Sequence, residues 1–277
     1  LYGYASKCLS KASAYCKGES YDDGSGYKKS SAKFTDVVGA HRAKVELGSI
    51  VDYFKDKKAI DRIGAGVDRS YLLVGPLDTA KSLARSVAGE VSAVLKEQNK
   101  SECLIVEIHA SSLISKSIKD ILKEAESRHT HCIIVLDEID RLYELKGVKS
   151  QTWSDLISAM NGLSKSKKDI FVITTATKAD FATQASVDRY GVYCSVENPT
   201  AKDRSNYFAQ ELKKRAVVSS SFDLESVARK SEGCTFTQLT TMLKRALAKS
   251  HTFRGSLSQD ILEKSVTEVM KAKPVTV

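Results

Sequence analysis

The sequence predicts an α/β fold in which a parallel sheet lies between helices, followed by a smaller part that is entirely helical. Short apolar runs alternate with segments of helical periodicity between residues 34 and 198. One of these runs, residues 132–136, is continuously apolar, which is typical of a strand buried on both faces of a parallel sheet. After Pro199 only helical periodicity remains.

We expect the elements in the following order. Residues 1–33 are rich in Ser, Lys, Gly and Tyr without periodicity, which predicts a flexible linker. Residues 34–198 form the α/β subdomain, with strands near 71–74, 103–108, 132–136, 170–175 and 192–196. Helices are expected near 43–54, 83–89, 113–122 and 153–163. Residues 199–277 form the helical subdomain, in which Phe208, Leu212, Leu239 and Val266 fall at helical spacing.

Two carboxylates, Asp137 and Glu138, follow the apolar run 132–136 directly. Ligands of open α/β sheets bind beyond the carboxyl ends of the strands. The arrangement is typical of the Walker B motif of P-loop NTPases, in which the first acid holds Mg²⁺ and the second positions water. The alternative interpretation is a buried strand that ends in a polar turn or helix cap.

A candidate phosphate-binding loop lies upstream, between the strand near 71–74 and the helix near 83–89. Strand, glycine turn, Lys-Ser and helix occur in the order of a Walker A loop, whose backbone N–H groups bind phosphates. The strict pattern G-x-x-x-x-G-K-[ST] fails, because Ala80 replaces the second glycine, and Asp78 adds a negative charge. The residues predicted to bind nucleotide here are Gly75, Pro76, Leu77, Asp78, Thr79, Ala80, Lys81 and Ser82, with Ser82 and Asp137 as Mg²⁺ ligands.

Composition narrows the functional classes. The 277 residues are 42% hydrophobic and 28% charged, as in ordinary globular proteins, and no apolar run is long enough to cross a membrane. The net charge of +9 indicates attraction to acidic surfaces, but no dense basic block supports nucleic-acid binding. The six scattered cysteines lack a C-x-x-C pair, which favours reduced core thiols in a reducing compartment.

Several stretches together resemble the AAA module of the FtsH family of membrane-anchored AAA proteases. They include Phe34-Thr35-Asp36-Val37-Val38-Gly39, Ile63-Gly64-Ala65, Leu72-Leu73-Val74-Gly75-Pro76 and Leu83-Ala84-Arg85-Ser86-Val87-Ala88-Gly89-Glu90. The resemblance runs from Phe34 to about residue 272. It implies a P-loop NTPase AAA+ core with a four-helix lid, a hexameric ring, and ATP or ADP with Mg²⁺ bound between subunits. The base is expected near Val38 and Gly39.

The chain departs from this family at the phosphate-binding loop. The family's loop reads G-P-P-G-T-G-K-T, whereas Leu77 replaces the second proline and Asp78 and Ala80 replace two glycines. Lys81 and Ser82 are retained. We therefore expect nucleotide binding to be weak.

Further departures concern hydrolysis. Thr177 aligns with the family's sensor Asn, and Phe236 aligns with a lid glycine near adenine. Of the family's two arginine-finger residues, one aligns with Arg189 and the other with Val192. The catalytic residues that the resemblance implies are Asp137, Glu138, Thr177 and Arg189, the last acting in the site of a neighbouring subunit.

The features by which the resembled family threads and cleaves a polypeptide are missing from residues 1–277. Residues 109–113 contain no aromatic pore loop, and no H-E-x-x-H zinc motif occurs. The histidines lack metal-site spacing, so we interpret them as surface or packing residues: His41, His109, His129, His131 and His251.

These observations favour a degenerate AAA+ module that senses nucleotide or has a structural role in a hexameric, heteromeric, membrane-associated complex. The expected partners are other FtsH-like subunits and a protein client, with membrane attachment through a segment outside this chain. The location would be a chloroplast (stromal face), mitochondrial (matrix face) or bacterial cytoplasmic membrane. The alternatives are an active ATP-hydrolysing motor and, supported by charge alone, a nucleic-acid-binding adaptor.

Overall fold

The computed structural model describes residues 26–64, 66–128, 130–144, 150–163, 166, 168–178, 191–217, 221–252 and 257–272. They form two compact units. The first unit contains the chain up to Val37 and the residues His41–Val196. The second contains Val38–Ala40 and the chain from Glu197 onward.

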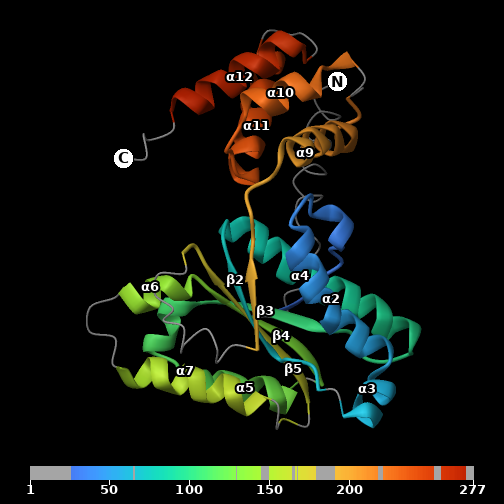
Figure 1. Ribbon diagram of the computed structural model, residues 1–277, viewed down its shortest axis with the longest axis vertical. Helices are drawn as coiled ribbons and strands as arrows, with labels where there is room; N and C mark the ends of the chain where they lie inside the picture. Colours follow the sequence, from blue (N-terminus) through green and yellow to red (C-terminus); the bar gives the residue numbers. More distant parts are fainter. Residues whose placement is uncertain are drawn as a thin grey trace. The chain divides into compact units, whose positions relative to one another are not determined.

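The described part of the first unit builds a six-stranded sheet (Figure 1) with the order β1-β3-β4-β5-β2-β6. Strands β2 to β6 run parallel, and β1 is antiparallel to β3. The predicted α/β fold with a parallel sheet is therefore confirmed. The strands are β1 (Tyr27–Lys29), β2 (Ser70–Val74), β3 (Leu104–His109), β4 (His131–Asp137), β5 (Asp169–Ala176) and β6 (Val192–Ser195).

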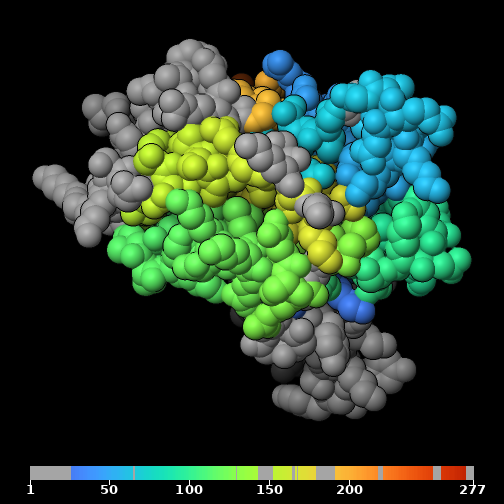
Figure 2. All heavy atoms as spheres, turned by 90° about the horizontal axis from the view of Figure 1, so that it is seen from below, coloured from blue at the N-terminus to red at the C-terminus, as the bar shows by residue number. Residues whose placement is uncertain are grey.

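Helices cover both faces of this sheet. Every residue of β2, β4 and β5 is buried, which explains their continuously apolar runs. Helices α2 (His41–Lys55) and α4 (Leu77–Glu97) pack together on one face, and α5 (Ile118–Arg128) and α7 (Ser150–Gly162) lie on the other (Figure 1). Figure 2 shows α5 and α7 side by side on their face. Short connections form η1 (Phe34–Asp36), α3 (Lys57–Ile63), η2 (Ala110–Ile114) and α6 (Ile139–Glu144).

Part of the N-terminal segment belongs to the sheet. Strand β1 adds to the edge of β3, and Tyr27 is buried there, which raises the pKa of its hydroxyl to about 12. The chain then passes so close to α4 that a Cβ at Gly89 would lie 2.0 Å from the Ala32 carbonyl oxygen. The prediction of a flexible linker over 1–33 is therefore wrong for residues 27–29, while residues 1–25 lie outside the described part.

A cluster of charged and polar side chains surrounds the buried carboxylate of Asp169 at the amino end of β5. Lys57 Nζ lies 2.6 Å from Oδ1, and the Tyr53 hydroxyl donates to Oδ1 at 2.9 Å. His131 Nδ1 lies 3.2 Å from Oδ2, without hydrogen-bond geometry, and Arg69 Nη2 lies 4.0 Å from Oδ1. Burial acts to raise the pKa of Asp169, but its contacts with His131, Lys57 and Tyr53 outweigh burial and hold the pKa well below its usual range. The cluster connects α2 and α3 to the sheet.

The second unit is helical throughout its described residues, which confirms the predicted helical C-terminal part. Its helices are α9 (Ala201–Lys214), α10 (Leu224–Lys230), α11 (Phe236–Thr252) and α12 (Gln259–Lys271). Thr200 begins α9 with a capping box, in which the Asp203 N–H donates to the Thr200 hydroxyl at 3.2 Å. The core contains Phe208, Leu212, Leu239, Met242, Leu262 and Val266, as the helical spacing predicts.

Two further sequence predictions concern thiols and membranes. The four cysteines in the described part, Cys103, Cys132, Cys194 and Cys234, are buried free thiols, in agreement with the interpretation as core residues. Burial raises the pKa of Cys132 to about 12, so its thiol is unreactive at neutral pH. Among the described helices, none combines the length and apolar character that a membrane span requires.

Candidate functional site

The site begins where β2 ends, at Gly75. Gly75 has a φ of +147°, and a Cβ there would lie 2.0 Å from the Val196 carbonyl oxygen, so no larger residue fits beside the chain leaving β6. The Gly75 N–H donates to the Ala176 carbonyl at 2.9 Å, which ties this turn to the end of β5. Pro76 follows as the N-cap residue of α4.

The residues predicted to form an open phosphate-binding loop instead form the first turn of α4. This helix begins at Leu77 rather than near residue 83, and the N–H groups of Thr79 and Ala80 both donate to the Pro76 carbonyl at 3.1 Å. The Ser82 hydroxyl donates to a backbone carbonyl of the same helix at 2.7 Å. The substitutions explain the difference, because alanine favours a helix over glycine by about 1 kcal/mol and a first-turn aspartate adds a favourable dipole interaction.

Lys81 reaches from this helix to Asp137, the first of the two predicted Walker B acids. Its Nζ lies 2.5 Å from Asp137 Oδ2, an ion pair in which the carboxylate is buried. The other carboxylate oxygen, Asp137 Oδ1, accepts a hydrogen bond from the Thr175 hydroxyl at 2.6 Å. Both oxygens of the predicted metal-binding acid therefore have a partner within the chain.

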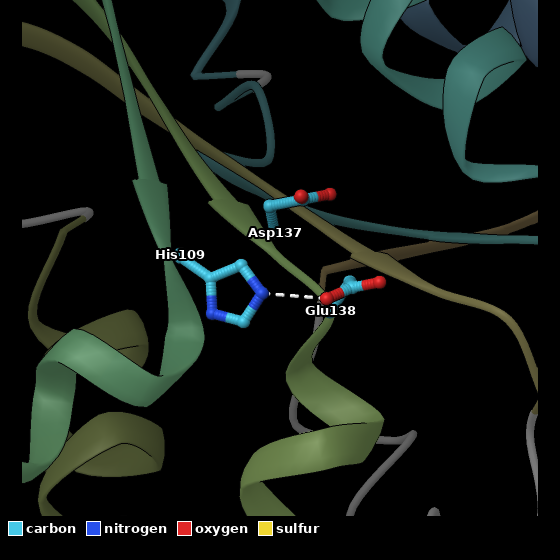
Figure 3. Close-up of side chains that lie close together, drawn as sticks. All are labelled: His109, Asp137 and Glu138. Carbon is cyan, nitrogen blue, oxygen red and sulfur yellow. Dashed lines mark hydrogen bonds and ion pairs between the residues drawn. The ribbon is translucent and has the colours of Figure 1, made fainter.

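Glu138 contacts a histidine that comes from the neighbouring strand. The pairing of β3 and β4 places His109 opposite Asp137. His109 Nε2 lies 2.5 Å from Glu138 Oε2 (Figure 3), and Arg141 Nη2 lies 3.0 Å from Oε1. The Glu138 N–H donates to the Thr175 hydroxyl at 3.2 Å, and its φ of +57° turns the chain sharply at the strand end.

Thr177, the predicted sensor residue, has a different partner. Its N–H donates to Asp140 Oδ2 at 2.8 Å, and its hydroxyl donates to the same oxygen. Asp140 is buried, and its Oδ1 has no hydrogen-bond partner. The hydroxyl of Thr177 is therefore directed to Asp140 and not to Asp137 or Glu138.

The remaining predicted residues lie elsewhere in the chain. Val38 and Gly39 belong to the second unit. Phe236 begins α11 and packs against Tyr207, with a distance of 5.3 Å between ring centroids. Arg189 lies outside the described residues. Of the predicted site, the structure thus gathers Lys81, Asp137 and Glu138, and the roles of the other residues stay predictions.

Sequence reasoning missed three residues at this strand end: His109, Thr175 and Asp140. Each follows or ends an apolar run, and the carboxyl ends of parallel strands meet at one edge of the sheet. Their position at the end of a predicted strand was the signal that could have identified these residues from the sequence. It was overlooked for His109 because the search for histidine ligands used spacing along the chain, whereas His109 meets Glu138 through strand pairing.

The site fits a Mg²⁺-nucleotide only in part. The two strand-end carboxylates are opposite in charge to a metal ion, and the lysine is opposite in charge to a phosphate. The phosphate-binding loop does not fit, because the first helical turn uses the N–H groups of Thr79 and Ala80 and the hydroxyl of Ser82. In this conformation, nucleotide phosphates lack the cradle of backbone donors that a P-loop supplies.

Comparisons with known proteins agree with the fold. The family described as "ATPase family associated with various cellular activities (AAA)" matches residues 71–198, from the second residue of β2 to beyond the end of β6. The fold and this match define an AAA-type ATPase module, a class that binds nucleotide with Mg²⁺.

Similar curated proteins identify the family more closely. An ATP-dependent zinc metalloprotease FtsH of Synechococcus sp. is 30% identical over 79% of this chain and 35% of its own length. A YME1 homolog of Caenorhabditis elegans is 32% identical over 79% of this chain and 31% of its own length. A chloroplastic FTSH 5 of Arabidopsis thaliana is 30% identical over 77% of this chain and 31% of its own length. The chain carries an AAA module of the FtsH family, and it spans about a third of the length of these relatives.

Proposed function

We propose that this chain is a degenerate FtsH-like AAA+ module that acts as a structural or nucleotide-sensing subunit, with slow or no ATP hydrolysis. One observation carries the proposal: the segment that should bind phosphates is the first turn of α4. ATP or ADP with Mg²⁺ has to open this turn before it binds, and the energy of opening weakens the affinity.

The contacts of the acidic residues support slow turnover. Lys81 neutralises Asp137, and His109 and Arg141 contact Glu138. Thr177 is engaged by Asp140. Phosphoryl transfer needs a positioned water and several charge-stabilising donors, and loss of one such donor typically costs about 10²–10³ in rate. Combined defects would bring a modest turnover close to the background rate.

We further propose that the module works in a hexameric ring beside related, active subunits. Arg189 would then act in a neighbour's site even if this chain hydrolyses little ATP. The complex would be attached to an organelle or bacterial membrane through a segment outside this chain, in a reducing compartment. The chloroplastic and bacterial relatives support such a location. No H-E-x-x-H motif is present, so this chain would contribute no zinc protease activity.

The main alternative is an active ATP-hydrolysing motor for a protein client. Its support is that the lysine of the phosphate-binding segment, Lys81, and the strand-end acids Asp137 and Glu138 are retained and lie near one edge of the sheet. A nucleic-acid-binding adaptor, by contrast, rests only on the net charge of +9.

A steady-state ATPase assay separates the proposed function from the motor. The purified chain should hydrolyse ATP near background, and Glu138→Gln should change that rate little. Glu225→Gln is a matched control, because the Glu225 side chain is 84% exposed on α10. A robust rate that Glu138→Gln abolishes and Glu225→Gln leaves intact would establish the motor and refute the degenerate assignment.

A further inference from the structure

Three potential metal ligands converge at the ends of β3 and β4. His109, Asp137 and Glu138 each offer one ligand atom, and these atoms lie within 4.8 Å of one another (Figure 3). The two carboxylates are buried and His109 is exposed at the edge of the group. The arrangement follows from backbone register, because His109 pairs with Asp137 across the sheet.

Each of the three side chains is also held from outside the group. Contacts of this kind orient metal ligands and leave their remaining polar atoms for the ion. Here the atoms that face the group are Nε2 of His109, Oδ2 of Asp137 and Oε2 of Glu138, of which Nε2 and Oε2 contact each other and Oδ2 contacts Lys81. The outer contacts are Ser111 Oγ to His109 Nδ1 (2.7 Å), Thr175 Oγ1 to Asp137 Oδ1 (2.6 Å) and Arg141 Nη2 to Glu138 Oε1 (3.0 Å).

We propose that His109, Asp137 and Glu138 form a binding site for a divalent transition-metal ion of the Zn²⁺ type. An imidazole nitrogen with two carboxylates suits Zn²⁺, whereas Mg²⁺ prefers oxygen ligands and retains several waters. Three protein ligands leave further coordination positions open. This site therefore prefers Zn²⁺, whereas a P-loop site built from a hydroxyl and carboxylates prefers Mg²⁺. It binds the ion without nucleotide.

Three contacts must change when the ion binds: that of His109 with Glu138, that of His109 with Ser111, and the ion pair of Lys81 with Asp137. Coordination through Nε2 breaks its contact with Glu138 and places the ring proton of His109 on Nδ1, which then donates to the Ser111 hydroxyl instead of accepting from the Ser111 N–H. The Lys81 ammonium, now 2.5 Å from Asp137, is displaced because the ion replaces it as the positive partner of the Asp137 carboxylate. Lys81 therefore competes with the metal, and Lys81→Met should bind the ion more tightly than the unchanged chain.

Calorimetric titration of the whole chelator-treated chain with Zn²⁺, and separately with Mg²⁺, tests this site in nucleotide-free buffer. We expect one Zn²⁺ per chain, bound at least tenfold more tightly than Mg²⁺. Loss of a ligand should weaken binding at least as much as loss of an outer contact, about 10- to 100-fold, so His109→Ala should lose at least tenfold in Zn²⁺ affinity. His251→Ala, which removes an exposed histidine of α11, is the matched control and should change nothing.

Two measurements guard against misfolding and thiol binding. His109→Asn keeps a hydrogen-bonding side chain without the ring nitrogen and should show the same loss with an unchanged circular dichroism spectrum. Co²⁺ should bind without thiolate charge-transfer absorption. Equal Zn²⁺ affinity in the unchanged chain and both His109 variants, or a Co²⁺-thiolate band, would refute the site. Because no nucleotide is present, either result leaves the proposed AAA function untouched.

Discussion

Restoring two glycines in the first turn of α4 should strengthen nucleotide binding. Ala80→Gly weakens the helix by about 1 kcal/mol. Asp78→Gly removes a few tenths of a kcal/mol of propensity and about 0.3–1 kcal/mol of favourable interaction with the helix dipole. Opening the turn that now uses the Thr79 and Ala80 N–H groups thus becomes easier by about 1.5–2 kcal/mol. Because 1.4 kcal/mol is a factor of ten, affinity should rise about 10- to 30-fold.

Fluorescence anisotropy of a labelled ADP, titrated with the chain in Mg²⁺ buffer, measures this change. The Asp78→Gly/Ala80→Gly variant should show the lower Kd, and each single variant should show part of the gain. Ala93→Gly makes the same helix-weakening change in α4 at a half-buried position away from the turn, so it should leave the Kd unchanged. The reasoning fails if the double variant binds no more tightly than the unchanged chain, or if Ala93→Gly gains as much.

Three other predictions concern the scaffold. Asp169→Asn should lower the free energy of unfolding by about 3 kcal/mol, because Lys57 and the mostly buried Arg69 lose their counter-charge, as calorimetry can measure. The folded-state pKa of Asp169 lies below its unfolded value, so this stabilisation is present above about pH 4 and is lost as the pH falls further. If the difference in unfolding free energy between the unchanged chain and Asp169→Asn stays the same in acid, the assignment is contradicted. Gly89→Ala should release the N-terminal strand to limited proteolysis, because its Cβ would lie 2.0 Å from a carbonyl oxygen, whereas Gly48→Ala, with nothing within 4 Å, should stabilise α2 by up to about 1 kcal/mol. Thr175→Val should cost about 1–3 kcal/mol in urea denaturation, because two buried polar groups lose their partner; a loss within experimental error would show that they find another.

Local sequence determined the architecture and part of the site. The continuously apolar run 132–136 predicted a strand buried on both faces, since the run is short and rich in β-branched residues and such a strand places every side chain in the core. Asp137 and Glu138 follow that strand directly, so their position at the carboxyl edge of the sheet could also be predicted. The change to helical periodicity after Pro199 predicted the helical unit, because the spacing of buried residues along a helix repeats every three to four residues and is visible in the local sequence.

Tertiary structure decided the contacts that depend on distant pairing. The 27–29 segment carries no strand pattern of its own, and it forms β1 only because the edge of β3 offers unpaired backbone groups. The start of α4 at Leu77 reflects a balance between loop and helix that the motif pattern does not weigh. His109 meets Glu138 only because β3 and β4 pair in one register. Strand register brings together residues that lie far apart along the chain, so their spacing in the sequence does not predict the contact.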